Sequence, residues 1–156
     1  MRSLIGIGLA VAVFGFAAGC GKKAGTSGPG GTAAAAGIEG GWTLVSLEAG
    51  GKTDPNIDKK SEAEKTIRAT ATQLISTKGG KEDPLGYKLD PSKTPADIDL
   101  TETDSDGKTD TMYGIYKLEG DTLTICAAVS DKPADRPKEF KTAPGGKTMI
   151  MTLKKK

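Results

Sequence analysis

The 156-residue chain carries 22 basic and 20 acidic residues, for a formal net charge of +2. This near balance argues against a nucleic-acid-binding protein, which normally needs a clustered basic face. The absence of histidine excludes Ser-His-Asp and Cys-His catalysis in their usual form, and also His-based zinc or iron sites. The three terminal lysines, Lys154 to Lys156, are interpreted as a solvated chain end.

The first 19 residues have the pattern of an export signal. Arg2 provides a short positive region, and residues 4–16 form an apolar run. A run of that length has the size of a signal-peptide core and is too short to cross a bilayer, which takes about 20 residues. Small residues, Ala17 to Gly19, follow it.

Cys20 directly follows these small residues, and this ending resembles the bacterial lipobox. The resemblance implies a diacylglycerol on the Cys20 sulfur and cleavage between Gly19 and Cys20. Ala17 stands where a lipobox usually has Leu, so an ordinary signal peptide or an uncleaved anchor are the alternatives. Cleavage removes only one charge, that of Arg2, and leaves a mature net charge of +1. Gly21, in place of an inner-membrane-retaining Asp, favours the outer membrane of the cell envelope, facing the periplasm or the exterior.

Residues 20–37 join this site to the rest of the chain. The stretch has no apolar residue larger than Ala after Cys20 and is rich in Gly and Ala. Such a composition predicts a flexible linker of about 20–25 Å. The sequence therefore divides into a signal peptide (1–19), a lipidated Cys with its linker (20–37) and one folded domain (38–156).

The folded domain shows short stretches of alternating polarity that are separated by turn residues. Two further segments depart from this pattern: the polar stretch from Asn56 to about Ala63, which predicts one short helix, and the Pro-containing stretch 132–138. About eight strands at regular spacing predict an all-β, antiparallel, lipocalin-like barrel. Strands are expected at 42–48, 67–72, 87–89, 97–101, 112–118, 123–127, 139–142 and 148–153, and residues 74–77 either continue the second strand or start another.

The order of several motifs resembles a planctomycete family of uncharacterised secreted and lipid-anchored domains, over nearly all of residues 39–154. The motifs are Gly40-Gly41-Trp42, Gly50-Gly51-Lys52, residues 87–91, Ile98-Asp99-Leu100, residues 114–118, residues 120–123, Cys126, Arg136-Pro137 and Phe140. The resemblance implies a lipocalin-like fold and brings no established activity.

In lipocalin-like barrels the first-strand Trp commonly packs under a basic side chain near the last strand. The resemblance therefore suggests that Trp42 and Arg136 form a cation–π pair, which is worth about 0.5–2 kcal/mol. The alternative is that Trp42 is simply a core residue and Arg136 is solvated.

Cys126 lies in an apolar strand and has no intramolecular disulfide partner if Cys20 carries a lipid. It is interpreted as a small buried hydrophobe, because no histidine is present to activate it. A reactive thiol, or a disulfide between chains, is the alternative.

Acidic residues occur in two suggestive patterns. The run from Asp104 to Asp110 crudely resembles a calcium loop, but Tyr113 stands where the bidentate Glu should be, so a hairpin turn is predicted. Asp97 and Asp99, on the polar side of an alternating strand, are expected to be solvated. Neither pattern predicts a metal site or a catalytic acid pair.

These observations favour a membrane-tethered lipoprotein whose barrel binds a small apolar ligand or an envelope partner. The alternative is a structural, envelope-maintenance lipoprotein with a filled core and no ligand. No enzymatic activity, cofactor, metal or nucleic-acid partner is expected. The ligand-binding residues and the oligomeric state do not follow from the sequence.

Overall fold

The computed structural model describes residues 37–104 and 106–156. The predicted signal peptide, Cys20 with its predicted lipid, and nearly all of the predicted linker lie outside these residues. In the part of the chain that is described, no helix is long and apolar enough to cross a membrane.

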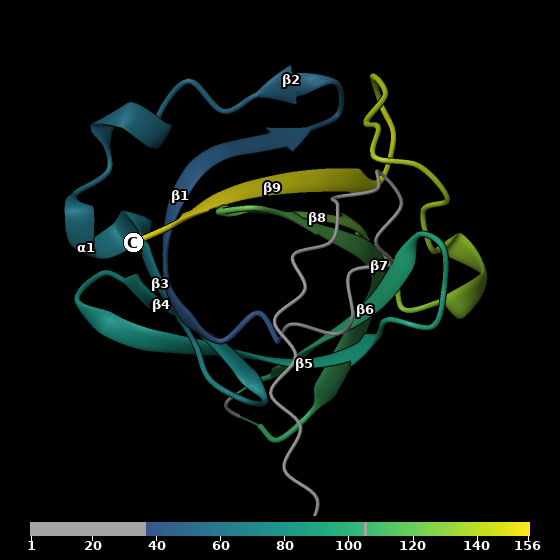
Figure 1. Cartoon of the computed structure of the whole chain (residues 1–156), viewed down its shortest axis with the longest axis horizontal. Helices are drawn as coiled ribbons and strands as arrows, with labels where there is room; N and C mark the ends of the chain where they lie inside the picture. Colours follow the sequence, from purple (N-terminus) through teal and green to yellow (C-terminus); the bar gives the residue numbers. More distant parts are fainter. Residues whose placement is uncertain (1–36, 105) are drawn as a thin grey trace, which may run out of the picture. The chain divides into compact units, whose positions relative to one another are not determined.

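The described chain is an all-β, closed barrel (Figure 1). From β3 to β9 each strand pairs with the next one along the chain in antiparallel fashion, while β1 pairs with β3 on one side and with β9 on the other. Eight strands close the barrel, and the two-residue β2 extends β1 at its edge. The predicted all-β barrel is confirmed. The strands are β1 (Gly40–Ala49), β2 (Lys52–Thr53), β3 (Thr66–Ala69), β4 (Gln73–Lys78), β5 (Lys81–Asp90), β6 (Ala96–Thr103), β7 (Thr109–Glu119), β8 (Thr122–Ala128) and β9 (Thr148–Lys155).

The polar segment before β3 forms two short helical pieces instead of the single helix predicted. They are η1 (Ile57–Lys59) and α1 (Glu62–Lys65). Lys60 between them is extended, and Ser61 starts α1 with a reciprocal capping box to Glu64. The cap satisfies the first free amides of α1 and thereby sets a new helix start after the break.

The segment 139–142 is not a strand, so that prediction is wrong. Between β8 and β9 the structure has only η2 (Pro133–Asp135) and irregular chain. The reason is topological: β8 pairs with β7 on one side and with β9 on the other, so no edge is left beside it. The covering segment (residues 129–147) instead runs over the outer wall. There the Thr142 hydroxyl donates to Glu48 Oε1 and accepts from the Gly51 amide.

A bulge in β1 adjusts which side chains face the interior. The register with β9 shifts between Leu44 and Ser46, and Val45 is 51 % exposed. A bulge inserts one extra residue into a strand and restores the alternation beyond it. Leu44 and Leu47 therefore both face inward, opposite Leu153 and Met151 of β9.

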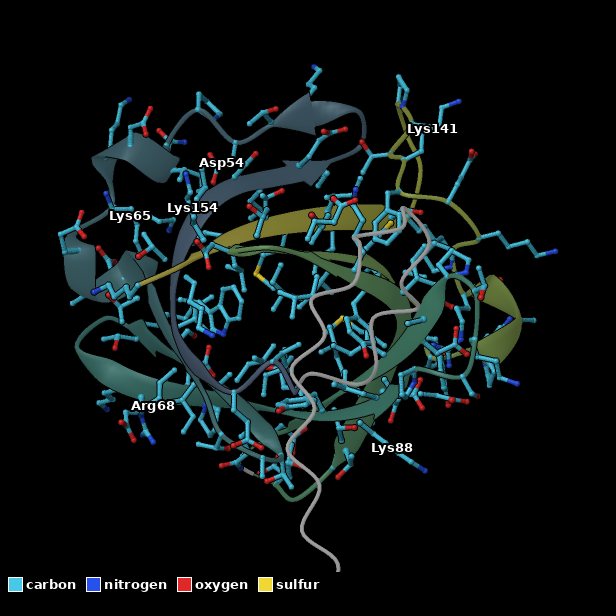
Figure 2. All side chains as sticks on the ribbon, viewed as in Figure 1. Asp54, Lys65, Arg68, Lys88, Lys141 and Lys154 are labelled. Atoms are coloured by element: carbon cyan, nitrogen blue, oxygen red, sulfur yellow. The ribbon has the colours of Figure 1, made fainter. Side chains whose placement is uncertain are left out.

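Side chains that alternate inward from every part of the wall form one apolar core. Those that are essentially inaccessible to solvent are Ile38, Trp42, Ile98, Leu100, Leu123, Ile125 and Leu153. Charged side chains such as Arg68, Lys88 and Lys141 point away from the interior (Figure 2). The core thus lies inside the barrel, and its wall is polar on the outside.

Candidate functional site

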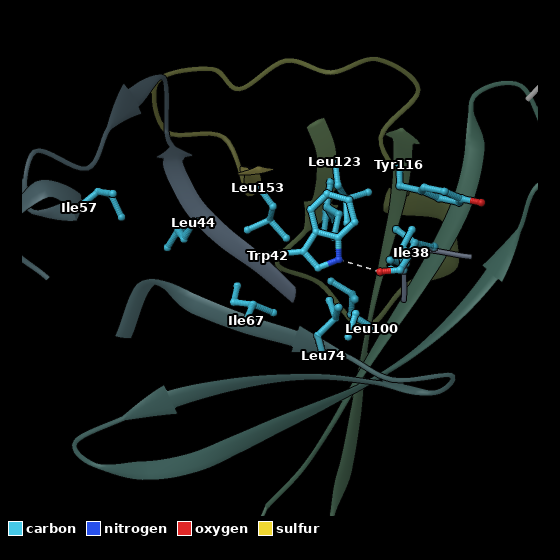
Figure 3. Packing of buried hydrophobic residues seen from close by; sticks show 14 residues of the cluster. Ile38, Trp42, Leu44, Ile57, Ile67, Leu74, Leu100, Tyr116, Leu123 and Leu153 are labelled. Carbon is cyan, nitrogen blue, oxygen red and sulfur yellow. Dashed lines mark hydrogen bonds between the residues drawn. The ribbon is translucent and has the colours of Figure 1, made fainter. Parts of the chain in front are cut away.

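The tether end of the barrel (the end where β1 begins, at Gly40) is closed from within by Ile38. Its side chain is fully buried although Gly37 and Glu39 on either side are exposed. The Trp42 indole Nε1 donates a hydrogen bond of 2.7 Å to the Ile38 carbonyl oxygen (Figure 3). The chain therefore enters the barrel before β1 begins, and Trp42 holds it there with its one polar atom satisfied.

The basic side chain near Trp42 is not the one that was predicted. The Lys155 Nζ lies 6.0 Å from the centre of the Trp42 ring, whereas the Arg136 guanidinium lies 5.3 Å from the centre of the Tyr113 ring. The predicted Trp42–Arg136 pair is therefore wrong. The register explains the difference, because Lys155 is the residue of β9 directly opposite Trp42.

Arg136 instead lies on the outer wall of β6 and β7. Its Nη1 donates to the backbone oxygens of Ile98 (3.2 Å) and Gly114 (2.5 Å). Its Nη2 bonds Asp99 Oδ1 at 2.5 Å, and its Nε lies 3.5 Å from Asp97 Oδ2. All three guanidinium nitrogens are thus engaged, so the arginine ties the covering segment to two strands.

This arrangement corrects the sequence interpretation of Asp97 and Asp99. Both were expected to be solvated, yet their side chains are only 24 % and 34 % exposed and pair with Arg136. Two hollows of about 240 and 410 Å³ adjoin the pairs, and both are lined by Asp97 and Arg136. Because the donors of Arg136 are already used within the protein, we assign the cluster to the stability of the wall.

Cys126 lies beneath the same covering segment. The thiol is fully buried on the outer side of β8, and its Sγ donates to the Glu139 carbonyl oxygen at 3.6 Å. It is the free cysteine of the described residues. Burial raises the pKa of the Cys126 thiol above its ordinary value. The interpretation of Cys126 as a buried hydrophobe fits this environment.

We expect Cys126 to resist alkylation while the protein is folded. A raised pKa leaves less thiolate at any given pH, and burial blocks access to the sulfur. In a Cys20→Ser variant, where Cys126 is the one remaining thiol, iodoacetamide should label the folded protein at least about 100-fold more slowly than the urea-unfolded protein, even at mildly alkaline pH. Equal labelling rates in the two states would show that the thiol is accessible.

The open end of the barrel (the end opposite Gly40) has a different character. Met112 faces inward opposite Leu100 and packs against the core, but it is only partly buried. It also lines a hollow of about 350 Å³ together with Val129, whose side chain is 58 % exposed. The carboxylates of Glu102, Asp110 and Asp131 stand around these two apolar side chains. This volume is within the range of small-ligand sites.

Next to this hollow, the predicted hairpin turn between β6 and β7 is confirmed. Asp104 Oδ1 accepts hydrogen bonds from the backbone amides of Asp106 (3.0 Å) and Lys108 (2.8 Å), so the carboxylate stabilises the turn. The Lys108 Nζ pairs with Asp110 at 2.9 Å. Within residues 37–104 and 106–156 no group of three or more acidic, Cys or His side chains could hold a metal ion.

The structure does not bring the sequence-predicted residues Trp42, Arg136 and Cys126 into one site. Trp42 lies inside the barrel, whereas Arg136 and Cys126 lie on its outer wall. Sequence reasoning missed Ile38 and Met112. Ile38 could have been found, because it is the first large apolar residue after a Gly/Ala-rich stretch. Met112 was recognisable only as a member of an alternating strand, which does not indicate a binding residue.

The fold places the chain among closed, up-and-down β-barrels of eight strands, which is consistent with a lipocalin-like fold. No protein-family model matches the chain, and neither a curated protein nor a solved structure matches it significantly.

Proposed function

We propose that this protein is an exported, non-catalytic lipoprotein, anchored in the cell envelope by a lipid on Cys20, whose barrel binds a small apolar ligand at its open end. The single observation that supports binding is the hollow around Met112, because an inward-facing core residue there remains accessible from outside. Methionine side chains adapt to ligands of varied shape, which suits an apolar guest. The signal-like residues 1–20 support the anchor.

A second candidate is a structural lipoprotein without a ligand. The filled core supports it, because Ile38, Trp42 and Leu153 are at most 1 % exposed. Both candidates include the anchor at Cys20. They differ only in whether a ligand binds at the open end of the barrel.

Mass spectrometry of the protein extracted from its native cells tests both parts. The mature chain is expected to begin at Cys20 and to carry the mass of a diacylglycerol and any further acyl group. A Cys20→Ser variant should lack that mass, whereas Cys126→Ser should keep it. A mature protein that starts elsewhere with an unmodified Cys20 would contradict the anchor.

The same measurement under native conditions reports a co-purifying molecule. We expect the wild type to carry one and Met112→Lys to lose it, because the lysine would pair with the carboxylates around the hollow and replace its apolar surface with a hydrated charge. Val45→Lys, on the exposed bulge of β1, should retain it. A wild-type protein that is empty in every preparation favours the structural candidate.

A further inference from the structure

Pairing between the first and last strands places the lysine-rich chain end at the tether end. Lys155 lies opposite Trp42, and the Lys156 amide donates to the Gly41 carbonyl oxygen at 3.0 Å. The C-terminus lies beside β1 and α1 (Figure 1). The three terminal lysines are therefore next to the point where the chain leads back to Cys20.

The three lysines spread over this end. All three are exposed: the Lys155 ammonium lies over the Trp42 ring, and the Lys156 Nζ donates to Thr66 Oγ1 at 2.9 Å. Lys154 alternates with Lys155 and so projects to the other face of β9. Among the described residues, no carboxylate lies within 4.0 Å of any of the three. Their positive charges are therefore available to a partner.

The nearby carboxylates do not neutralise the charges of these lysines by forming ion pairs with them. Glu62 on α1 is already paired with Lys65 at 2.7 Å. Glu39, Glu119 and Asp121 are exposed acidic residues on the adjoining segments, and Glu119 is paired with Lys117 at 2.7 Å. The linker adds Lys22 and Lys23 immediately after Cys20. On the described segments the three terminal lysines outnumber the two exposed carboxylates, those of Glu39 and Asp121, that form no ion pair there.

Negative charge gathers on one hairpin of the open end. The hairpin of β6 and β7 carries four carboxylates around Lys108, which are those of Glu102, Asp104, Asp106 and Asp110. A negatively charged surface therefore attracts the terminal lysines and repels this hairpin. The two effects together favour an orientation in which the terminal lysines face such a surface.

We propose that Lys154, Lys155 and Lys156 form a membrane-facing surface that binds anionic phospholipid headgroups. The proposal rests on the proposed anchor at Cys20, since a linker of about 20–25 Å keeps the lysines close to the bilayer. Lysines near an anionic surface each add to membrane attachment, and a lipid chain with a basic cluster anchors more durably than the lipid alone. The open end with Met112 then faces away from the membrane.

The test uses the lipidated protein in vesicles of phosphatidylcholine alone or of an equimolar mixture with phosphatidylglycerol, each with a dansyl-labelled headgroup lipid. Trp42 is the single tryptophan of the chain, so energy transfer from it reports how near the tether end lies to the headgroups. Transfer should be about twofold higher on the anionic vesicles at low salt, and about 0.5 M salt should remove the difference.

The variant Lys154→Gln/Lys155→Gln/Lys156→Gln should show the same transfer on both vesicle types. The matched control neutralises three exposed lysines towards the open end, Lys78, Lys81 and Lys147, and should behave as the wild type. Equal transfer for the wild type on both vesicles, or an unchanged triple variant, would overturn the proposal.

Flotation with the vesicles separates this proposal from the anchor. Protein that floats with neutral vesicles is anchored by lipid, whatever the transfer shows. Protein that floats only with anionic vesicles supports the lysine surface and contradicts the anchor. Protein that floats with neither contradicts both.

Discussion

Replacing Arg136 by alanine should lower the free energy of unfolding by about 2–4 kcal/mol. The change removes the donors to two backbone oxygens, those of Ile98 and Gly114, and leaves Asp97 and Asp99 as neighbouring like charges. Removing one partner of a fully buried ion pair can lower the free energy of unfolding further. We expect a smaller loss here because these carboxylates are partly exposed. Urea unfolding followed by Trp42 fluorescence measures the loss.

Two companion variants show whether this loss comes from the guanidinium geometry. Arg136→Lys keeps the charge but cannot bond both strands and both carboxylates, so we expect a loss of about half that size. Arg68→Ala breaks an exposed pair with Glu82, whose side chains are 58 % and 71 % exposed, and should cost less than about 1 kcal/mol. If the Arg136→Ala and Arg68→Ala midpoints coincide, the assignment of Arg136 to the wall is wrong.

Replacing Trp42 by alanine should cost about 3–5 kcal/mol, because the side chain is 1 % exposed and fills the barrel. Trp42→Phe keeps most of the ring volume but leaves the buried Ile38 carbonyl oxygen without its donor, which costs about 1–3 kcal/mol. Circular dichroism in a urea titration measures both, since each change removes the fluorophore.

Val45→Ala is the matched control on the same strand. Val45 is 51 % exposed on the bulge, so its truncation should change the free energy of unfolding by less than about 0.5 kcal/mol. A Trp42→Phe variant as stable as the wild type would mean that the hydrogen bond to Ile38 does not hold the entering chain in place.

Many strands and turns of the barrel could be predicted because the patterns that specify them lie within short stretches of sequence. Ile98 and Leu100 alternate with Asp97, Asp99 and Thr101, and β6 forms over this stretch. Gly79-Gly80 and Gly120-Asp121 marked two turns, and both glycines of the first turn have φ above +50°. The error at 139–142 arose because a strand needs a free neighbouring edge, and residue pattern alone does not show one.

The side-chain pairs could not be predicted in the same way, because they join residues far apart in the sequence. Arg136 reaches Asp99 across 37 positions and Gly114 across 22. Which lysine or arginine lies over Trp42 depends on the register of β9 against β1, and that register includes the bulge at Val45. Moving the pairing by one residue would place a different side chain there.

The closure of the barrel by β9 also determines when the chain can fold. β1 is made near the start of the described chain and β9 at its end, yet β9 provides the partners of both β1 and β8. Until Thr148 to Lys155 have emerged, the growing chain holds two unpaired strand edges and a core without Leu153. Contacts between such distant residues form slowly. The growing chain is therefore prone to aggregation until its last strand, β9, has been made.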